Sequence, residues 1–125
     1  NTDKSYAIVH ALDGYDEISL TGGSKIITPQ SESIIYPSTF GLDTVEATAI
    51  VGGETVEDSA EIFTAILNGN GSQAQNRVVC ANAAIAIATA EHCSLNTAYE
   101  KAEESLLEKK ALNSLKKLQA LSAEL

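Results

Sequence analysis

Three acidic side chains crowd into five residues near the start of the chain. Asp13, Asp16 and Glu17 lie in the run D-G-Y-D-E. Carboxylate oxygens suit hard divalent cations, and Mg²⁺ is usually held by one or two carboxylates together with water and substrate phosphates. A tight loop after Gly14 would let the two adjacent side chains converge on one ion or on a pair of ions, so Asp16 and Glu17 are candidate Mg²⁺ ligands. The alternative is an acidic loop that contacts only solvent.

Two residues beside this pair are weaker candidates. Asp13 could support the ligands from behind, but Asp-Gly is also a common turn dipeptide, and we favour the turn. His10 could face the same site, although a single histidine at the end of a strand is more often a hydrogen-bonded structural residue. The roles of Asp13 and His10 are left open. No side chain stands out as a catalytic nucleophile.

The acidic run follows a segment that is predicted to be a buried strand. Residues 6–9 are apolar and partly β-branched, and Asp13-Gly14 follows as a turn. In open α/β sheets, ligands gather at the carboxyl ends of the strands. The strand therefore places the acidic residues where a ligand is expected.

The composition indicates one domain and excludes some partners. With 125 residues, 44% of them apolar, the chain can bury one core. Its net charge of −9 falls within residues 1–62, where eleven acidic residues oppose two lysines. Nucleic acids and anionic membranes require clustered Lys and Arg, so we expect neither as a partner. No secretion signal or long apolar run is visible, and we expect a cytoplasmic protein.

The two cysteines, Cys80 and Cys93, lie thirteen residues apart. They lack the paired spacing of zinc sites and redox motifs. We read both as free thiols, with a disulfide left open.

The order of patterns indicates an α/β fold, with β-strands and a hairpin in the first half packed against about four C-terminal helices, as part of a larger α/β domain. Two short β-branched runs, residues 25–30 and 33–36, predict the hairpin. Residues 44–51 alternate in polarity and suit either a loop or a strand at the sheet edge. Helical periodicity begins near residue 54.

Three residues are predicted to cap helices: Thr55, Ser72 and Ser94. The first helix is expected to bury one face, made of Val56, Ala60, Phe63 and Leu67. The second is apolar on every side over residues 78–88 and belongs in the core, where Asn82 needs a partner. We favour a backbone partner over a ligand. The final helix, from about residue 111, has a leucine face and a lysine face that we read as solvated rather than as a phosphate site.

Three motifs resemble those of anthranilate phosphoribosyltransferases. The run from His10 to Ser19 is similar to the family's V-H-G-x-D-G-x-D-E-x-S, with Ala11 where Gly is usual. The segment from Pro37 to Leu42 resembles P-E-D-F-G-L, and Asn82-Ala83-Ala84 is a third match. The resemblance covers nearly all of this chain but only the C-terminal part of such an enzyme.

This resemblance implies that residues 1–125 are the C-terminal portion of the α/β catalytic domain, without the N-terminal helical domain and the pyrophosphate loop. It implies transfer of the 5-phosphoribosyl group from phosphoribosyl pyrophosphate to anthranilate, in tryptophan biosynthesis. Asp16 and Glu17 would bind the Mg²⁺ that accompanies the donor. The intact protein would be a homodimer, and the isolated piece is expected to be inactive.

Several family features have no counterpart in this chain. The G-T-G-G-D loop, the K-H-G-N segment and the arginine that contacts anthranilate are missing, and Arg77 is the only arginine. The alternatives are therefore a pyrimidine nucleoside phosphorylase-like or other paralogous transferase, and a non-catalytic acidic domain that binds calcium or a partner protein. The acceptor is not specified by these residues.

Overall fold

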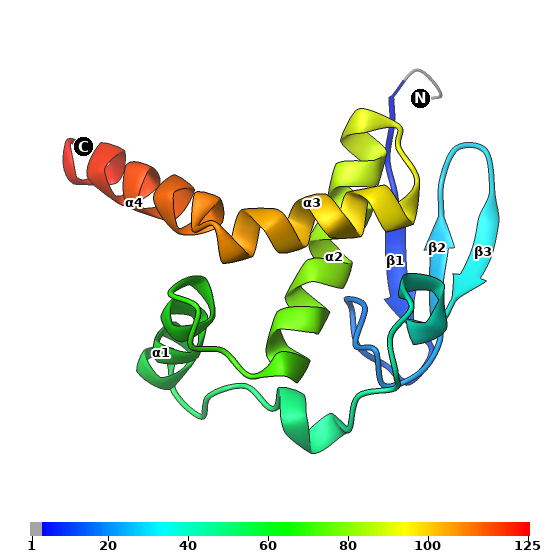
Figure 1. Cartoon of the computed structure of the whole chain (residues 1–125), viewed down its shortest axis with the longest axis horizontal. Helices are drawn as coiled ribbons and strands as arrows, with labels where there is room; N and C mark the ends of the chain where they lie inside the picture. The colour runs from blue at the N-terminus through cyan, green and yellow to red at the C-terminus, as the bar shows by residue number, and fades with distance from the viewer. Residues whose placement is uncertain (1–3) are drawn as a thin grey trace.

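A three-stranded antiparallel sheet packs against helices in the computed structural model, which describes residues 4–125 (Figure 1). Asp3, one of the eleven acidic residues counted above, lies outside the described residues. The sheet has the order β1-β2-β3. The elements are β1 (Ile8–Ala11), β2 (Ser24–Ile27), β3 (Glu32–Ile35), the 3-10 helices η1 (Pro37–Phe40) and η2 (Ala47–Ile50), α1 (Val56–Leu67), α2 (Gln73–Glu91), α3 (Leu95–Leu107) and α4 (Lys110–Ala123). The predicted α/β class, with a hairpin first and four helices after it, is confirmed.

The strands differ slightly from the predicted ranges. The first strand was expected over residues 6–9, but β1 begins at Ile8 and continues to Ala11, where it meets the acidic run directly. The hairpin of β2 and β3 is confirmed, with Ser24 opposite Ile35 and Ile27 opposite Glu32. Residues 44–51 form no strand. Of the two alternatives, a loop or a strand at the sheet edge, the loop is correct, and it leads into η2.

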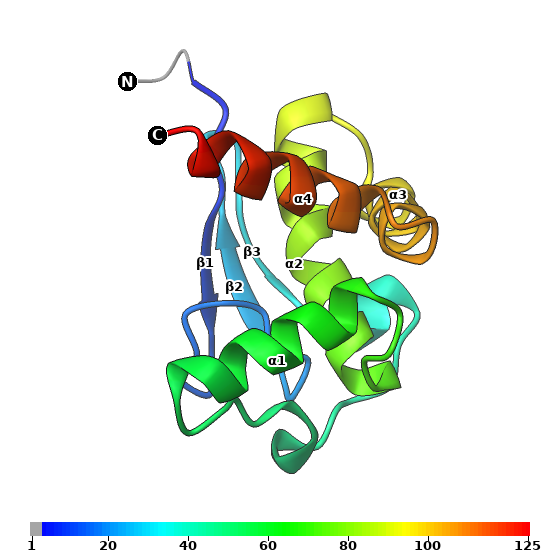
Figure 2. The same cartoon turned by 90° about the vertical axis from the view of Figure 1, so that its left-hand side faces the viewer.

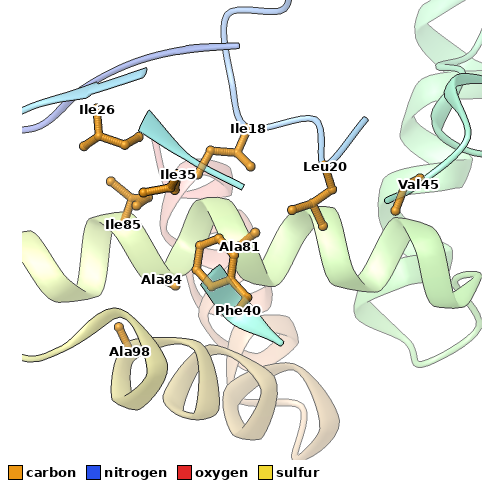
Figure 3. Packing of buried hydrophobic residues seen from close by; sticks show 10 residues of the cluster. All are labelled: Ile18, Leu20, Ile26, Ile35, Phe40, Val45, Ala81, Ala84, Ile85 and Ala98. Carbon is orange, nitrogen blue, oxygen red and sulfur yellow. The ribbon is translucent and has the colours of Figure 1, made fainter. Parts of the chain in front are cut away.

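Helix α2 lies between the sheet and α3 and joins them in one core (Figure 3). Ala81 and Ala84 on α2 and Ala98 on α3 are fully buried, and their small side chains let the helices approach closely. The buried cluster contains Ile18, Leu20, Ile26, Ile35, Phe40, Val45, Ala81, Ala84, Ile85 and Ala98. The prediction of a core helix is correct on these sides only, because Val79 is exposed on another side of α2.

The three predicted helix caps are confirmed. Thr55 Oγ1 accepts a hydrogen bond from the Asp58 N–H at 3.0 Å, at the start of α1. Ser72 and Ser94 do the same at the starts of α2 and α3, with donor–acceptor distances of 3.1 and 3.2 Å. Each bond satisfies a backbone N–H that the first helical turn leaves unpaired.

The predicted buried face of α1 is correct only at Leu67. Val56 is 82% exposed, Phe63 is 54% exposed and Ala60 is also exposed, whereas Leu67 is buried together with Ile66. The buried pair packs into a second cluster with Cys80, Ala102, Leu106 and Leu112. The helix carries apolar residues on more than one side. Figure 2 shows α1 in front of the lower end of α2, and packing of the end of α1 against residues of α2, α3 and α4 decides which side is covered.

The far face of the sheet carries large hydrophobic side chains that are open in this chain, beside the Lys25–Glu32 ion pair. Ile8, Leu12, Ile34 and Tyr36 are all about half exposed. A side chain at Gly23 would meet Tyr36 Cε1 at 3.0 Å and Ile34 Cγ2 and Leu12 Cδ1 at 3.2 Å, so these three side chains gather over the glycine. We call Ile8, Leu12, Ile34 and Tyr36 the outer sheet face.

Within residues 4–125, no single helix is long and apolar enough to cross a membrane. Helices α2 and α3 pass that test only together, as a pair bent by 117°.

Both cysteines are free thiols, but their environments differ. Cys80 is buried and Cys93 is partly exposed. Burial, with a smaller contribution from Glu103, raises the pKa of the Cys80 thiol to about 11. Because the thiolate is the nucleophile, Cys80 is expected to stay unreactive near pH 8.

Alkylation therefore provides a test of the packing around α2. Iodoacetamide at pH 8 is expected to modify Cys93 and to leave Cys80 unmodified until denaturant is added, as read by peptide mass spectrometry. Equal labelling of both cysteines in the folded chain would contradict the buried position of Cys80.

Candidate functional site

The acidic residues lie in a tight loop between β1 and Ile18, which we call the acidic loop (residues 12–17). The Gly14 N–H donates to the Ala11 carbonyl at 3.1 Å, and the Ala11 N–H donates to the Tyr15 carbonyl at 3.0 Å. Gly14 has φ +105°, a backbone conformation that glycine adopts far more readily than other residues. The predicted turn at Asp13-Gly14 is confirmed.

Asp13 stabilises one side of this loop through hydrogen bonds. Its carboxylate accepts hydrogen bonds from the hydroxyl groups of Ser19, at 3.4 Å, and Thr21. These two hydroxyls are also hydrogen bonded to each other at 2.7 Å, and Ser19 is buried. Asp13 thus ties the turn to the segment that leaves the loop, a contact that the sequence reasoning did not anticipate.

Asn82 stabilises the other side of the acidic loop through hydrogen bonds to Ile18. Its side-chain Oδ1 accepts a hydrogen bond from the Ile18 N–H at 2.9 Å, and its Nδ2 donates to the Ile18 carbonyl at 2.8 Å. The same Nδ2 donates to the Val78 carbonyl, one turn earlier in α2, at 2.9 Å. The expectation that Asn82 has a backbone partner is confirmed, and the partner is the residue that follows Glu17.

The two predicted metal ligands are both exposed. Glu17 borders a cavity of about 380 Å³ that it shares with Tyr15, Ile18, Ser19, Ile50, Val78, Val79 and Asn82. Asp16 precedes it in the loop and is not among the residues that line this cavity. The arrangement has one carboxylate at the rim of a mainly apolar hollow and a second beside it in the chain.

A metal site at this loop would be completed by water or by ligands from elsewhere. Within residues 4–125 no group of three or more His, Cys, Asp and Glu side chains lies close enough to hold an ion. Two exposed carboxylates alone fit the way Mg²⁺ is bound, since this ion commonly keeps several waters and takes further oxygens from substrate phosphates. They do not fit Ca²⁺, which requires six to eight oxygen ligands.

His10 does not join this site. It lies in β1 opposite Lys25 of β2, is exposed, and does not line the cavity beside Glu17. Among the described residues its side chain also has no hydrogen bond, so the expectation of a hydrogen-bonded structural histidine is not met either.

Two lysines at the start of α4, Lys109 and Lys110, have partners within the protein. Lys109 Nζ donates to the Asn68 carbonyl at 2.7 Å, and Lys110 pairs with Glu104 at 3.2 Å. Both lysines are exposed. The prediction that the lysine face of the final helix is solvated holds for Lys109 and Lys110.

A second cavity, of about 270 Å³, lies at the opposite end of the sheet. Its lining includes Thr28, Ser31, Thr89 and His92. The Thr28 and Ser31 hydroxyls bond to each other at 3.1 Å, and the Thr89 hydroxyl donates to the Ile85 carbonyl at 2.7 Å. The polar groups of this cavity are thus largely paired within the protein.

Known proteins resemble this chain in sequence. The sequence model of the glycosyl transferase family, a/b domain, matches residues 2–112. The chain is 56% identical to an anthranilate phosphoribosyltransferase of Flavobacterium johnsoniae and 57% identical to one of Christiangramia forsetii, in each case over 122 residues. These alignments cover 98% of this chain and 37% of each relative, so the chain spans a little over a third of their length.

Solved structures show the same fold. The crystal structure of anthranilate phosphoribosyltransferase (TrpD) from Thermus thermophilus matches with a TM-score of 0.80 at 24% identity, covering 89% of this chain and 33% of that chain. The Saccharomyces cerevisiae anthranilate phosphoribosyltransferase in complex with PRPP and Mg matches with a TM-score of 0.76 at 23% identity, over 88% of this chain and 32% of that one.

Proposed function

The chain belongs to the glycosyl transferase family through its a/b domain, and on that basis we propose that it forms the C-terminal portion of the α/β catalytic domain of an anthranilate phosphoribosyltransferase. Its contribution is a pair of Mg²⁺ ligands, Asp16 and Glu17. The reaction transfers the 5-phosphoribosyl group from phosphoribosyl pyrophosphate to the amino group of anthranilate and releases pyrophosphate. The names of the relatives support this choice of reaction over a nucleoside phosphorylase.

The position of Glu17 is the observation that carries the proposal. It lies at the rim of a cavity whose other lining residues come from η2 and α2 as well as from the acidic loop and the segment after it. The loop that holds it is fastened by Asp13 on one side and Asn82 on the other. An exposed carboxylate on a fastened loop beside a hollow is suited to meeting a cation that arrives with a phosphorylated ligand.

The residues of this chain would act by binding and orientation. Asp16 and Glu17 supply anionic oxygens, and the side chains of Ile50, Val78 and Val79 make part of the cavity wall apolar. Mg²⁺ held by these two carboxylates would supply charge neutralisation for the departing pyrophosphate. No nucleophilic side chain is needed for this role.

Other parts of the site would come from the remaining two thirds of such a protein. The outer sheet face supports this part of the proposal, because its half-exposed large hydrophobic side chains offer a surface that further chain could cover. The chain alone is then incomplete and inactive as a transferase. The intact protein is proposed to be a cytoplasmic homodimer.

A Mn²⁺ titration followed by NMR tests the proposed ligands directly. Mn²⁺ favours the same oxygen ligands as Mg²⁺ and broadens nearby amide signals, even where binding is weak. We expect the signals of residues 15–18 and of Asn82 to broaden first. The Glu17→Gln variant is expected to remove this selective broadening.

The acidic first turns of α1 provide the control. Glu61→Gln removes a carboxylate that is also exposed and is expected to leave broadening at the acidic loop unchanged. Broadening that begins instead at Glu57, Asp58 and Glu61 would mean that the cation recognises general negative charge, and the proposed site would be wrong.

A further inference from the structure

The amide of Asn82 makes an unusual pair of contacts with one residue. It accepts from the N–H of Ile18 at 2.9 Å and donates to the carbonyl of the same residue at 2.8 Å, across 64 positions of sequence. Ile18 is itself 2% exposed, so both backbone groups lie in a region with little access to water. An unpaired buried backbone group is costly, and one primary amide satisfies both groups at once.

These bonds hold the peptide group that joins Glu17 to Ile18. The Ile18 N–H belongs to the peptide group that also contains the Glu17 carbonyl, so this peptide plane is held by Asn82 Oδ1. The Ile18 side chain points into the core that α2 shares with the sheet (Figure 3). With Ile18 anchored at backbone and side chain, Glu17 is left at the rim of the cavity.

We propose that Asn82 is a positioning residue for the cation ligand Glu17. This inference rests on the proposed function, because it assigns Asn82 a task at the same site. Asn82 does not contact the cation. It acts by holding the Glu17–Ile18 peptide in the one orientation that presents the Glu17 carboxylate to the cavity.

Substitution of Asn82 by aspartate can distinguish the positioning role from an effect of charge alone. In Asn82→Asp the acceptor to the Ile18 N–H is retained, but the carboxylate has no donor for the carbonyls of Ile18 and Val78 and repels both. The same substitution adds a negative charge close to Glu17. If only charge mattered, cation affinity would rise, whereas loss of positioning requires it to fall.

The test measures Mn²⁺ affinity in Asn82→Asp and Asn82→Ala by the broadening of residues 15–18. Loss of a residue that orients a metal ligand commonly weakens affinity by roughly 10- to 100-fold, and we expect a decrease of about 10-fold or more in both variants. Signals of β2, β3 and α3 are expected to keep their positions, which shows that the fold is intact. Equal or tighter binding in folded Asn82→Asp would overturn the inference.

A second variant controls for general loss of stability. Leu112→Ala empties part of the other hydrophobic cluster, on α4, and leaves the bonds to Ile18 in place. It is expected to lower the unfolding midpoint without changing Mn²⁺ affinity. A matching loss of affinity in Leu112→Ala would show that stability, and not the position of Glu17, controls binding.

Hydrogen exchange separates failure of this inference from failure of the proposed function. Without metal, Asn82→Ala is expected to speed exchange of the Ile18 amide relative to the amides of β2. If the unmodified chain binds no Mn²⁺ at the acidic loop, the proposed function is wrong even where this exchange result is obtained. If exchange at Ile18 is unchanged, the positioning role is wrong whatever the metal result.

Discussion

Replacing Glu17 with glutamine is expected to reduce pyrophosphate release by about 10²- to 10³-fold in the full-length transferase that would contain this chain, because removing one group that stabilises developing charge in a transition state commonly costs this much. Glutamine keeps the size of the side chain and removes its charge. The measurement is the initial rate with saturating anthranilate and phosphoribosyl pyrophosphate, repeated over a range of Mg²⁺ concentrations.

The dependence on Mg²⁺ identifies the cause of this loss. If Glu17 binds the ion, the Mg²⁺ concentration needed for half-maximal rate rises in Glu17→Gln, and added Mg²⁺ recovers part of the activity. Glu61→Gln serves as the matched control and is expected to retain the rate of the unmodified enzyme. A Glu17→Gln enzyme with full activity and an unchanged Mg²⁺ requirement would remove the central support for the proposed function.

Replacing Phe40 with alanine is expected to destabilise the chain by about 3–5 kcal/mol. Phe40 is 8% exposed, and its ring lies against that of Tyr99 with centroids 5.5 Å apart. Its removal leaves a cavity between η1, α2 and α3, at a point where the sheet and helices share one core. Urea unfolding followed by circular dichroism gives the change in the free energy of unfolding.

The same substitution at Phe63 is the comparison. Phe63 lies on α1 and is 54% exposed, so Phe63→Ala is expected to change stability by less than about 0.5 kcal/mol. This pair of variants tests which face of α1 is buried, since the sequence pattern had assigned Phe63 to the buried one. Similar losses in both variants would mean that α1 packs through the face first predicted.

Local features of the fold could be predicted because they depend on neighbours in sequence. Thr55, Ser72 and Ser94 cap helices by bonding to backbone groups three residues ahead, and the structure has each of these bonds. The buried face of α1 was predicted correctly only at Leu67. Apolar residues occur on several sides of that helix, and packing with Leu106 and Leu112, which lie far along the chain, selects Ile66 and Leu67.

The candidate site also has some parts that could be predicted from the sequence and others that could not. The acidic loop is visible in the sequence because its carboxylates and its glycine turn are adjacent. The cavity beside Glu17 is not, since Ile50 and Val78 come from distant elements that meet only in the folded chain. The need of Asn82 for a partner followed from its apolar surroundings, but nothing in the sequence identified that partner as Ile18.

Helix α2 contributes to both hydrophobic clusters, with Ala81 in one and the adjacent Cys80 in the other. Two cores that share a helix cannot lose their packing independently, because melting either one removes a wall of the other. The chain is thus expected to unfold in a single cooperative step. The acidic loop is tied through Asn82 to that shared helix, so its end at Ile18 is expected to lose its order only when the helix does.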